Sequence, residues 1–299
     1  MKEKKTKQHK MRSNELDLDM SWPGNWQLDK RFRFENFVLD QNNSEAYEIA
    51  QKVLMGSLCG IPIVIHSATG FGKTHILQAI GNEALRRDPK VRVALFSVER
   101  FFNEFIFALR DGTDETFRAK IRYCYDVCLV DDLTAIDRKP QIQRELFLSL
   151  KEQSGNGCKI VLASALPLDA MLDWHDEFKT WLLSGINVGI GKPSAETLLA
   201  FLKSYLTENG ISTSGGLAEY LYSVGEPNFR VLAHTVMKLQ FAAQLENVAP
   251  TLEYARKIFK RGKQQFDYFS GLAGSDTVIG ASRKNRRGKK TYGSNTTTI

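Results

Sequence analysis

Short apolar runs alternate with longer stretches of helical periodicity through residues 44–190. The runs occur at Ile61–Ile65, Val91–Phe96, Val127–Val130, Ile160–Ala163 and Ile186–Ile190. Each run is continuously apolar, which is the pattern of strands buried on both faces of a parallel sheet. Because helical stretches separate the runs, we expect crossover helices on both faces of that sheet. The pattern therefore predicts the α/β class.

Two of the helical stretches carry a clear apolar stripe. The stripe positions are Ile76, Leu77, Ile80 and Ala84 in the first, and Ile142, Leu146, Phe147 and Leu150 in the second. Residues at this spacing share one face of an α-helix. We expect both faces to pack against the sheet.

The pattern changes after Lys192-Pro193, where only helical stretches follow. They are interrupted near Asn209-Gly210, Gly215-Gly216, Gly225 and Pro250. Ser194 is a typical N-cap residue, and Leu198, Leu199 and Leu202 form the apolar stripe behind it. The sequence predicts a flexible basic segment at 1–30, an α/β domain at 31–191, a small all-helical domain at 192–262 and a disordered basic tail at 263–299.

The composition of the 299 residues, 42% hydrophobic and 25% charged, is that of an ordinary soluble protein. The apolar runs are about five residues long, whereas a membrane span needs about 18 or more. No apolar stretch follows the basic N-terminal residues, so we expect no secretory signal and a cytoplasmic protein without membrane contact. Cys59, Cys124, Cys128 and Cys158 lie in apolar segments and are expected to be reduced core residues.

The net charge of +7 comes from the two ends of the chain. Residues 1–12 hold six basic groups and one acid, residues 277–299 hold six basic groups and no acid, and the middle is mildly acidic. The C-terminal cations are Arg283, Lys284, Arg286, Arg287, Lys289 and Lys290. On a flexible arm they can contact nucleic-acid phosphates in a salt-dependent way, or serve only as a solubilising tail.

Between the first apolar run and its helix lies the segment Ser67-Ala68-Thr69-Gly70-Phe71-Gly72-Lys73-Thr74. Glycines let backbone N–H groups converge on phosphate oxygens, and the following helix adds its positive dipole end. The predicted ATP or ADP ligands are Thr69, Gly70, Phe71, Gly72, Lys73, Thr74 and His75. Thr74 is also a predicted ligand of Mg²⁺. Ser67 stands where the usual motif has glycine, a departure that narrows the backbone choices and that we expect to tighten or distort the entry turn.

The run Val127–Val130 ends in Asp131-Asp132, two carboxylates at the carboxyl end of a buried strand. Ligands of open α/β sheets bind at that edge. We therefore predict Asp131 as a second group of the magnesium site. Asp132 is the predicted catalytic residue that orients or deprotonates a water for attack on the γ-phosphate.

Several motifs occur in the order found in one family. They are Phe32-Arg33-Phe34-Glu35-Asn36-Phe37, the segment HSATGFGKTHILQAIGN, Phe102-Asn103-Glu104-Phe105-Ile106 with Leu109-Arg110-Asp111, Val130-Asp131-Asp132, and Pro227-Asn228-Phe229-Arg230. Over residues 31–262 the chain resembles the AAA+ ATPase core of the bacterial replication initiator DnaA family. The resemblance implies that Asn36, Phe37 and Val38 line an adenine pocket. It also implies that Arg230, in a helical lid, is a catalytic sensor arginine for the γ-phosphate.

The chain departs from the family at two positions. The family's polar sensor after the fourth strand aligns with Ala165, which follows Ser164. The family's arginine finger, which acts on a neighbouring subunit, aligns at or near Trp181, and the nearby Lys179 lacks the planar fork of arginine. A finger supplies about 10³–10⁵-fold in turnover, so these departures leave ATP hydrolysis open.

The expected DNA contacts are non-specific. We do not expect the family's helix-turn-helix domain in the polar residues after Gly262. Arg118, Lys120 and Arg122 resemble the family's region for single-stranded DNA, although such a charged stretch is also typical of a solvated helix face. The segment Glu15-Leu16-Asp17-Leu18-Asp19-Met20 is a degenerate form of a sliding-clamp-binding peptide, or an acidic linker.

Two functions are compatible with these observations. In the first, the chain is an ATP–Mg²⁺-switched protein of chromosomal replication initiation or its control, with contacts to the initiator, other replication proteins or DNA. In the second, it is a non-hydrolysing adaptor, similar to Hda or a helicase loader, that keeps the nucleotide as a structural ligand.

Overall fold

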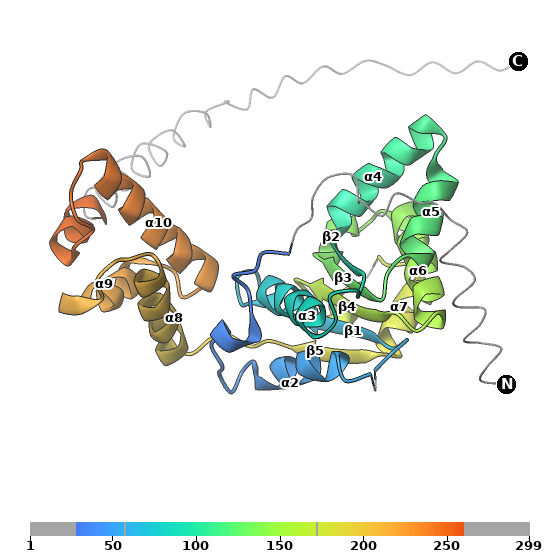
Figure 1. The fold of residues 1–299 in the computed structure, drawn as a ribbon, viewed down its shortest axis with the longest axis horizontal. Coiled ribbons are helices and arrows are strands. Elements are labelled where there is room, and N and C mark those ends of the chain that lie inside the picture. The colour runs from blue at the N-terminus through green and yellow to red at the C-terminus, as the bar shows by residue number, and fades with distance from the viewer. Residues whose placement is uncertain (1–27, 57, 172, 260–299) are drawn as a thin grey trace, which may run out of the picture.

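A computed structural model describes residues 28–56, 58–171 and 173–259. Its centre is a five-stranded parallel sheet in the order β2-β3-β4-β1-β5 (Figure 1). The strands are β1 (Pro62–His66), β2 (Val93–Ser97), β3 (Val127–Asp131), β4 (Lys159–Ser164) and β5 (Ile186–Gly189). All five apolar runs are strands, so the predicted α/β class with a parallel sheet is confirmed.

Alternate residues of each strand supply two separate cores. Cys128 and Val130 of β3 belong to one buried cluster, while Val127 and Leu129 belong to the other. Successive side chains of a strand point to opposite faces of a sheet, so both faces need an apolar cover. This double burial explains why the strands are continuously apolar in sequence.

Helices cover both faces of this sheet. Two of these helices, α2 (Ser44–Val53) and α3 (Lys73–Arg87), contribute residues to one core. The other core contains residues from α4 (Val98–Asp111), α5 (Asp114–Tyr123), α6 (Pro140–Gly155) and α7 (Asp176–Leu183). The stripe residues predicted on α3 and α6 are all buried. Short 3-10 turns occur at η1 (Phe34–Asn36), η2 (Leu133–Ile136) and η3 (Leu168–Ala170).

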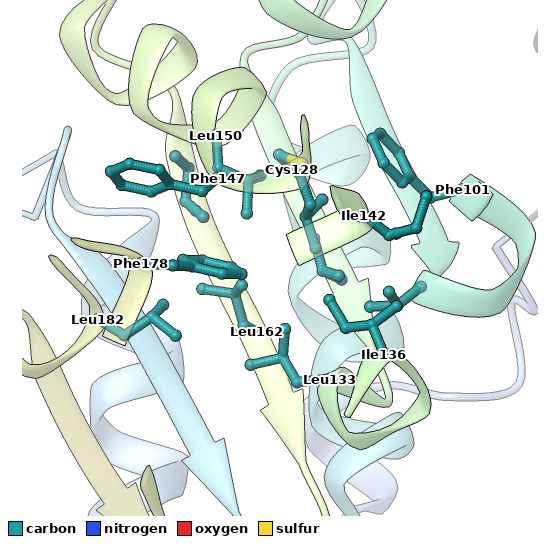
Figure 2. Close-up of a cluster of buried hydrophobic side chains, with 14 of the residues drawn as sticks. Phe101, Cys128, Leu133, Ile136, Ile142, Phe147, Leu150, Leu162, Phe178 and Leu182 are labelled. Carbon is teal, nitrogen blue, oxygen red and sulfur yellow. The ribbon is translucent and has the colours of Figure 1, made fainter. Parts of the chain in front are cut away.

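The larger core anchors the segment that follows the acidic end of β3. Leu133 and Ile136 of η2 are fully buried and lie among Ile142, Leu162 and other apolar side chains (Figure 2). Two buried anchors within four residues fix the backbone immediately after Asp132. Packing therefore helps to set the geometry of the predicted site.

A separate helical unit lies to one side of the sheet (Figure 1). It contains α8 (Ala195–Glu208), the turn η4 (Ser214–Gly216), α9 (Leu217–Val224) and α10 (Phe229–Leu245), followed by helical residues 252–259. Its own core includes the fully buried Leu198, Leu202 and Leu239. Ser194 caps α8 as expected, because its Oγ accepts a hydrogen bond from the Thr197 N–H at 3.2 Å. We call this unit the lid.

Two smaller expectations have different outcomes. Cys124, Cys128 and Cys158 are buried free thiols, as predicted, but Cys59 is exposed because it lies in the turn before β1. Within residues 28–259, apart from the two positions not described, no helix is long and apolar enough to cross a membrane.

Candidate nucleotide site

The phosphate loop runs from the end of β1 to the start of α3. Gly70 and Gly72 have φ values of +84° and +108°, a region that side chains other than glycine rarely enter. Ser67 is not among the described residues with positive φ, so its position does not require glycine. The first N–H groups of α3 have no partners within the helix and open onto this loop, which makes it suited to an anion.

Lys73 is a buried cation held by neutral oxygens. Its Nζ donates to Ser67 O at 2.6 Å, to Ala68 O at 3.1 Å and to Ser67 Oγ at 3.2 Å, and the residue is 9% exposed. No ion pair joins it to any described carboxylate. Burial lowers the pKa of Lys73, which the negative charges of Asp131 and Asp132 partly oppose. A buried ammonium without an anionic partner fits a phosphate ligand.

Thr74 and Asp131 come together as the magnesium prediction requires. The Thr74 Oγ1 hydroxyl donates to Asp131 Oδ2 at 2.7 Å, although the two residues are 57 positions apart. The other carboxylate oxygen accepts from the Asp132 N–H at 2.9 Å. A hydroxyl and a carboxylate are oxygen donors of the kind that Mg²⁺ takes beside phosphate oxygens. These two residues would hold the ion, whose charge would neutralise the phosphates.

Asp132 occupies a constrained turn at the end of β3. Its backbone is left-handed, with φ 58° and ψ 61°. The side chain is exposed and accepts a hydrogen bond from Thr134 Oγ1 at 2.6 Å. The carboxylate is thus oriented beside Asp131 at the sheet edge, where it can contact a water next to a bound phosphate.

The predicted base end of the site is an aromatic cluster. Phe37 stacks on Tyr47 with ring centroids 5.7 Å apart and meets His75 edge-on at 5.2 Å. A Cβ added to Gly72 would lie 3.1 Å from the Phe37 ring. The ring of Phe37 therefore reaches the phosphate loop itself, and Val38 follows it, half-buried.

One face of α3 holds the segment that leads into this cluster. Three side chains at helical spacing bind its backbone: His75 Nε2 donates to Arg33 O, Gln78 Oε1 accepts from Asp29 N–H, and Asn82 Nδ2 donates to Asp29 O and Phe32 O. Asn36 instead binds its own turn, because its Nδ2 donates to Arg31 O at 2.7 Å. Its predicted role toward adenine remains a prediction.

Burial lowers the pKa of both histidines near the site, His66 at the end of β1 and His75 in α3. A neutral His75 can still donate from Nε2 to the Arg33 carbonyl. The lowered pKa values favour the neutral form of both imidazoles.

Arg230 lies in the first turn of α10. It is exposed, and its positive charge contributes to lowering the pKa of Lys73. The preceding Asn228 is bonded to the phosphate loop, with its Nδ2 donating to Thr69 O at 2.7 Å. The lid thus places a second cation within electrostatic range of Lys73. The role of Arg230 as a sensor of the γ-phosphate remains a prediction.

A second connection joins the lid to the body at the start of α8. Asp40 accepts hydrogen bonds from the Thr197 hydroxyl at 2.6 Å and from the Ser194 N–H at 2.8 Å. Its hydrogen bonds, that of Thr197 foremost, hold the pKa of Asp40 well below its usual range. Asn42 adds a bond from its Nδ2 to Lys192 O at 2.9 Å. We call this group the hinge contact.

The two departures from the family have structural counterparts. The hydroxyl of Ser164 bonds within its own turn, to the carbonyl and the N–H of Leu166. Trp181 stacks on Phe178 and meets Phe147 edge-on, which makes it part of the packing around the larger core. Lys179 Nζ donates to Met171 O at 2.7 Å.

The predicted DNA-contacting cations lie on α5. Arg118 forms ion pairs with Asp114, Glu115 and Glu145, and Arg122 also pairs with Glu145. Lys120 is only 9% exposed. These contacts give the two arginines a structural role, so a DNA contact stays a prediction. The tail cations from Arg283 to Lys290 and the segment Glu15–Met20 lie outside the described residues.

A parallel sheet in this order, a glycine loop before α3, an acidic pair after β3 and an arginine from a helical lid together define a P-loop AAA+ domain. Residues 28–189, just over half of the chain, match the Bacterial DnaA ATPase domain. The chain belongs to this family.

Individual relatives agree with this assignment. The chromosomal replication initiator protein DnaA of Helicobacter pylori is 33% identical over 230 residues, which are 77% of this chain and 50% of that protein. The crystal structure of domain III of the Thermotoga maritima initiator DnaA has a TM-score of 0.73 and 27% identity, covering 79% of this chain and 98% of that one.

A structure of the initiator DnaA bound to AMPPCP and single-stranded DNA has a TM-score of 0.66 and 27% identity. It covers 86% of this chain and 78% of that one. Against the curated relatives, however, the chain spans only about half of their length.

Three functional features were not predicted from the sequence. The hydroxyl of Ser67 binds Lys73, Asp40 fixes the start of the lid, and Asn228 joins the lid to the phosphate loop. Asn228 carried a usable signal, since an asparagine directly before a helical stretch is a common N-cap. Its contact with Thr69 crosses 159 positions and leaves no local pattern.

Proposed function

We propose that this chain binds ATP with Mg²⁺ and uses the nucleotide as a conformational switch in the initiation of chromosomal DNA replication or in its control. The observation that carries the proposal is the juxtaposition of Lys73, the Thr74–Asp131 pair and Arg230 in a member of the DnaA ATPase family. Each group matches a different part of a magnesium-bound triphosphate.

Each residue of the site has a distinct task in this proposal. The α3 N-terminus and Lys73 bind the phosphates, while Thr74 and Asp131 hold Mg²⁺. Phe37, Val38 and His75 surround the base. Arg230 contacts the γ-phosphate, so that the lid distinguishes ATP from ADP, and Asp132 orients a water molecule. Bound magnesium would supply charge neutralisation at the phosphates.

Hydrolysis stimulated by a second copy of this chain is not part of the proposal. Trp181 aligns at or near the position expected for the arginine finger, and its ring packs against Phe147 and Phe178. A packed indole carries no guanidinium to a neighbouring γ-phosphate. Binding and release of nucleotide are sufficient for a switch.

DNA is the proposed macromolecular partner. A relative of similar fold has been solved with AMPPCP and single-stranded DNA, which supports the same ligand class here. Arg118 and Arg122 are already paired with acids, so a contact through α5 requires these ion pairs to rearrange. The replication initiator itself is a further proposed partner. The sliding clamp has weaker support, because the expected peptide is degenerate.

The deciding experiment measures binding of single- and double-stranded DNA at one fixed salt concentration, with and without ATP. The whole chain is compared with a version that ends at Gly262. We expect ATP-dependent binding of single strands that survives removal of the tail. Binding that ignores ATP and disappears with the tail would refute the switch and reduce the DNA contact to electrostatic attraction by the tail.

A further inference from the structure

Asn228 joins the lid to the phosphate loop with one side chain. Its Oδ1 caps α10 by accepting from the Arg230 N–H at 2.9 Å and the Val231 N–H at 3.3 Å. Its Nδ2 donates in the other direction, to Thr69 O at 2.7 Å. The two ends of a single amide therefore fix the first turn of α10 against the body.

The phosphate loop is shaped to receive this amide. A Cβ added to Gly70 would lie 2.0 Å from Asn228 Oδ1, far inside contact distance. A side chain at position 70 would therefore displace Asn228, in addition to straining a backbone with φ +84°. The glycine serves the approach of the lid as well as the curvature of the loop.

We propose that Asn228 is a positioning residue, a latch that holds Arg230 at the phosphate loop and so sets the preference of the site for a nucleoside triphosphate over a diphosphate. This inference rests on the proposed nucleotide site. Arg230 follows Asn228 by two residues on the same helical turn, and its charge already acts on Lys73.

The physical reason is preorganisation. A charged group that is held in place before the ligand arrives loses less freedom on binding, and this saving appears as affinity. A preorganised Arg230 increases the affinity only for a ligand whose phosphate it contacts. In our proposal that phosphate is the γ-phosphate. A diphosphate lacks that group, so loss of the latch should reduce affinity for ATP and leave affinity for ADP nearly unchanged.

The latch and the hinge contact are separate attachments of the lid among the described residues. The hinge contact, centred on Asp40, fixes the start of α8, and Asn228 fixes the start of α10. A rigid unit attached at one point can still rotate, whereas two separate points largely remove that rotation. The hinge contact uses no residue of the phosphate loop. Among the described residues, the hydrogen bond of the latch ties the lid to the phosphate end of the site.

Two substitutions separate the latch from helix capping. Asn228→Ser keeps a capping oxygen but is too short to reach Thr69, and Asn228→Asp keeps the cap but presents an acceptor to the Thr69 carbonyl. Serine, aspartate and asparagine are similarly good N-caps. If the neutral Asn228→Ser and the charged Asn228→Asp change the nucleotide affinities alike, the added charge of aspartate is not the cause. Ser97→Ala is the matched control away from the lid. It removes the N-cap of α4, in which the Ser97 Oγ accepts a hydrogen bond from the Arg100 N–H.

The first measurement is the affinity for ATP and for ADP. We expect both Asn228 variants to bind ATP about tenfold more weakly, the loss typical of one hydrogen bond, with ADP affinity changed by less than about twofold. The Ser97 variant should retain both affinities. Equal losses for ATP and ADP, or no loss for either, would overturn the positioning role.

The second measurement needs no nucleotide. Spin labels introduced through Arg110→Cys in α4 and Gln244→Cys in α10, in a Cys59→Ser background, report the distance between body and lid; both labelled positions are exposed. We expect a narrow distance distribution with Asn228 intact and a broader one in both variants. An unchanged distribution would refute the latch. If the unmodified chain fails to bind ATP, the proposed function fails, while this distance measurement still judges the latch separately.

Discussion

The nucleotide edge of the sheet and the helix α7 are built in opposite ways. At the nucleotide edge, Lys73 is buried among neutral oxygens and Asp132 is held in a left-handed turn, arrangements that packing alone does not favour. In α7, Trp181 was predicted to lie at or near the position of a charged finger, and it packs against Phe147 and Phe178. The nucleotide edge presents polar groups suited to a ligand, whereas this part of α7 packs as part of the hydrophobic core.

This difference bears in opposite ways on the proposed nucleotide binding and on hydrolysis stimulated by a second copy. The nucleotide edge presents Lys73, Thr74 and Asp131, although Ala165 stands where the polar sensor is expected. Helix α7 presents the aromatic Trp181 at or near the position expected for the finger. We therefore expect substitutions in the two regions to have separate effects, on nucleotide affinity in one and on stability in the other. The following predictions test the contrast from its strongest expected effect to its weakest.

Replacing Lys73 should have the largest effect. Lys73→Ala removes the buried ammonium from the phosphate loop, and we expect affinity for a fluorescent ATP analogue to fall by more than about 100-fold. Lys52→Ala is the control, since Lys52 is exposed on α2 and pairs only with Glu48 among the described residues. Retained affinity in the Lys73 variant would show that the ligand site lies elsewhere.

Replacing Trp181 should affect stability and not binding. Trp181→Ala leaves a gap beside Phe147 and Phe178, and we expect the free energy of unfolding in urea to fall by about 2 kcal/mol. ATP affinity should stay within about twofold of the original value. Leu183→Ala, on the same helix but 52% exposed, should change stability by less than about 0.5 kcal/mol. A large loss of ATP affinity in the Trp181 variant would contradict the separation of the two regions.

The magnesium site gives a more specific test. Asp131→Asn keeps the size of the side chain but removes its charge, so we expect ATP to bind about tenfold more weakly when Mg²⁺ is present. With excess chelator, the variant and the unmodified chain should bind equally. Asp111→Asn, at the exposed end of α4, serves as the control. A loss that persists without magnesium would indicate a role for Asp131 other than metal binding.

The smallest effect concerns pH. Burial lowers the pKa of His66 and His75 from 6.5, so the unfolded chain takes up protons at a higher pH than the folded chain does. Their contribution to stability is complete above about pH 6.5 and falls as the pH decreases below that value, by less than about 1.4 kcal/mol per unit for each histidine.

The variant His75→Gln retains an amide donor for Arg33 O and should flatten this pH dependence in urea unfolding experiments. An identical slope in the His75 variant would show that this residue does not contribute to the pH dependence.

Much of the fold could be predicted from the sequence because burial on both faces leaves a strong local pattern. Every apolar run became a strand, and the stripes on α3 and α6 are buried as expected. Cys59 was placed wrongly, since an apolar neighbourhood in sequence says little about a turn residue.

The candidate site was only partly predictable. Thr74 and Asp131 belong to local motifs, so their meeting follows from the strand–loop–helix order once the sheet is parallel. Asp40 and Asn228 act through the relative placement of body and lid, which no periodicity encodes. The Ser67 hydroxyl accepts from Lys73 only because the lysine side chain turns back toward β1. That side-chain direction is set by tertiary packing and leaves no pattern in the sequence.

The left-handed backbone of Asp132 limits which residue types are tolerated at this position. Only glycine, asparagine and aspartate enter that region at low cost, so the turn restricts the choice of residue before any chemistry is considered. An alanine at this position would remove the carboxylate and strain the turn at once, and its effects on turnover would be ambiguous. Asparagine keeps the backbone and removes only the charge. The conformation of one residue thus decides which substitution can isolate its chemical role.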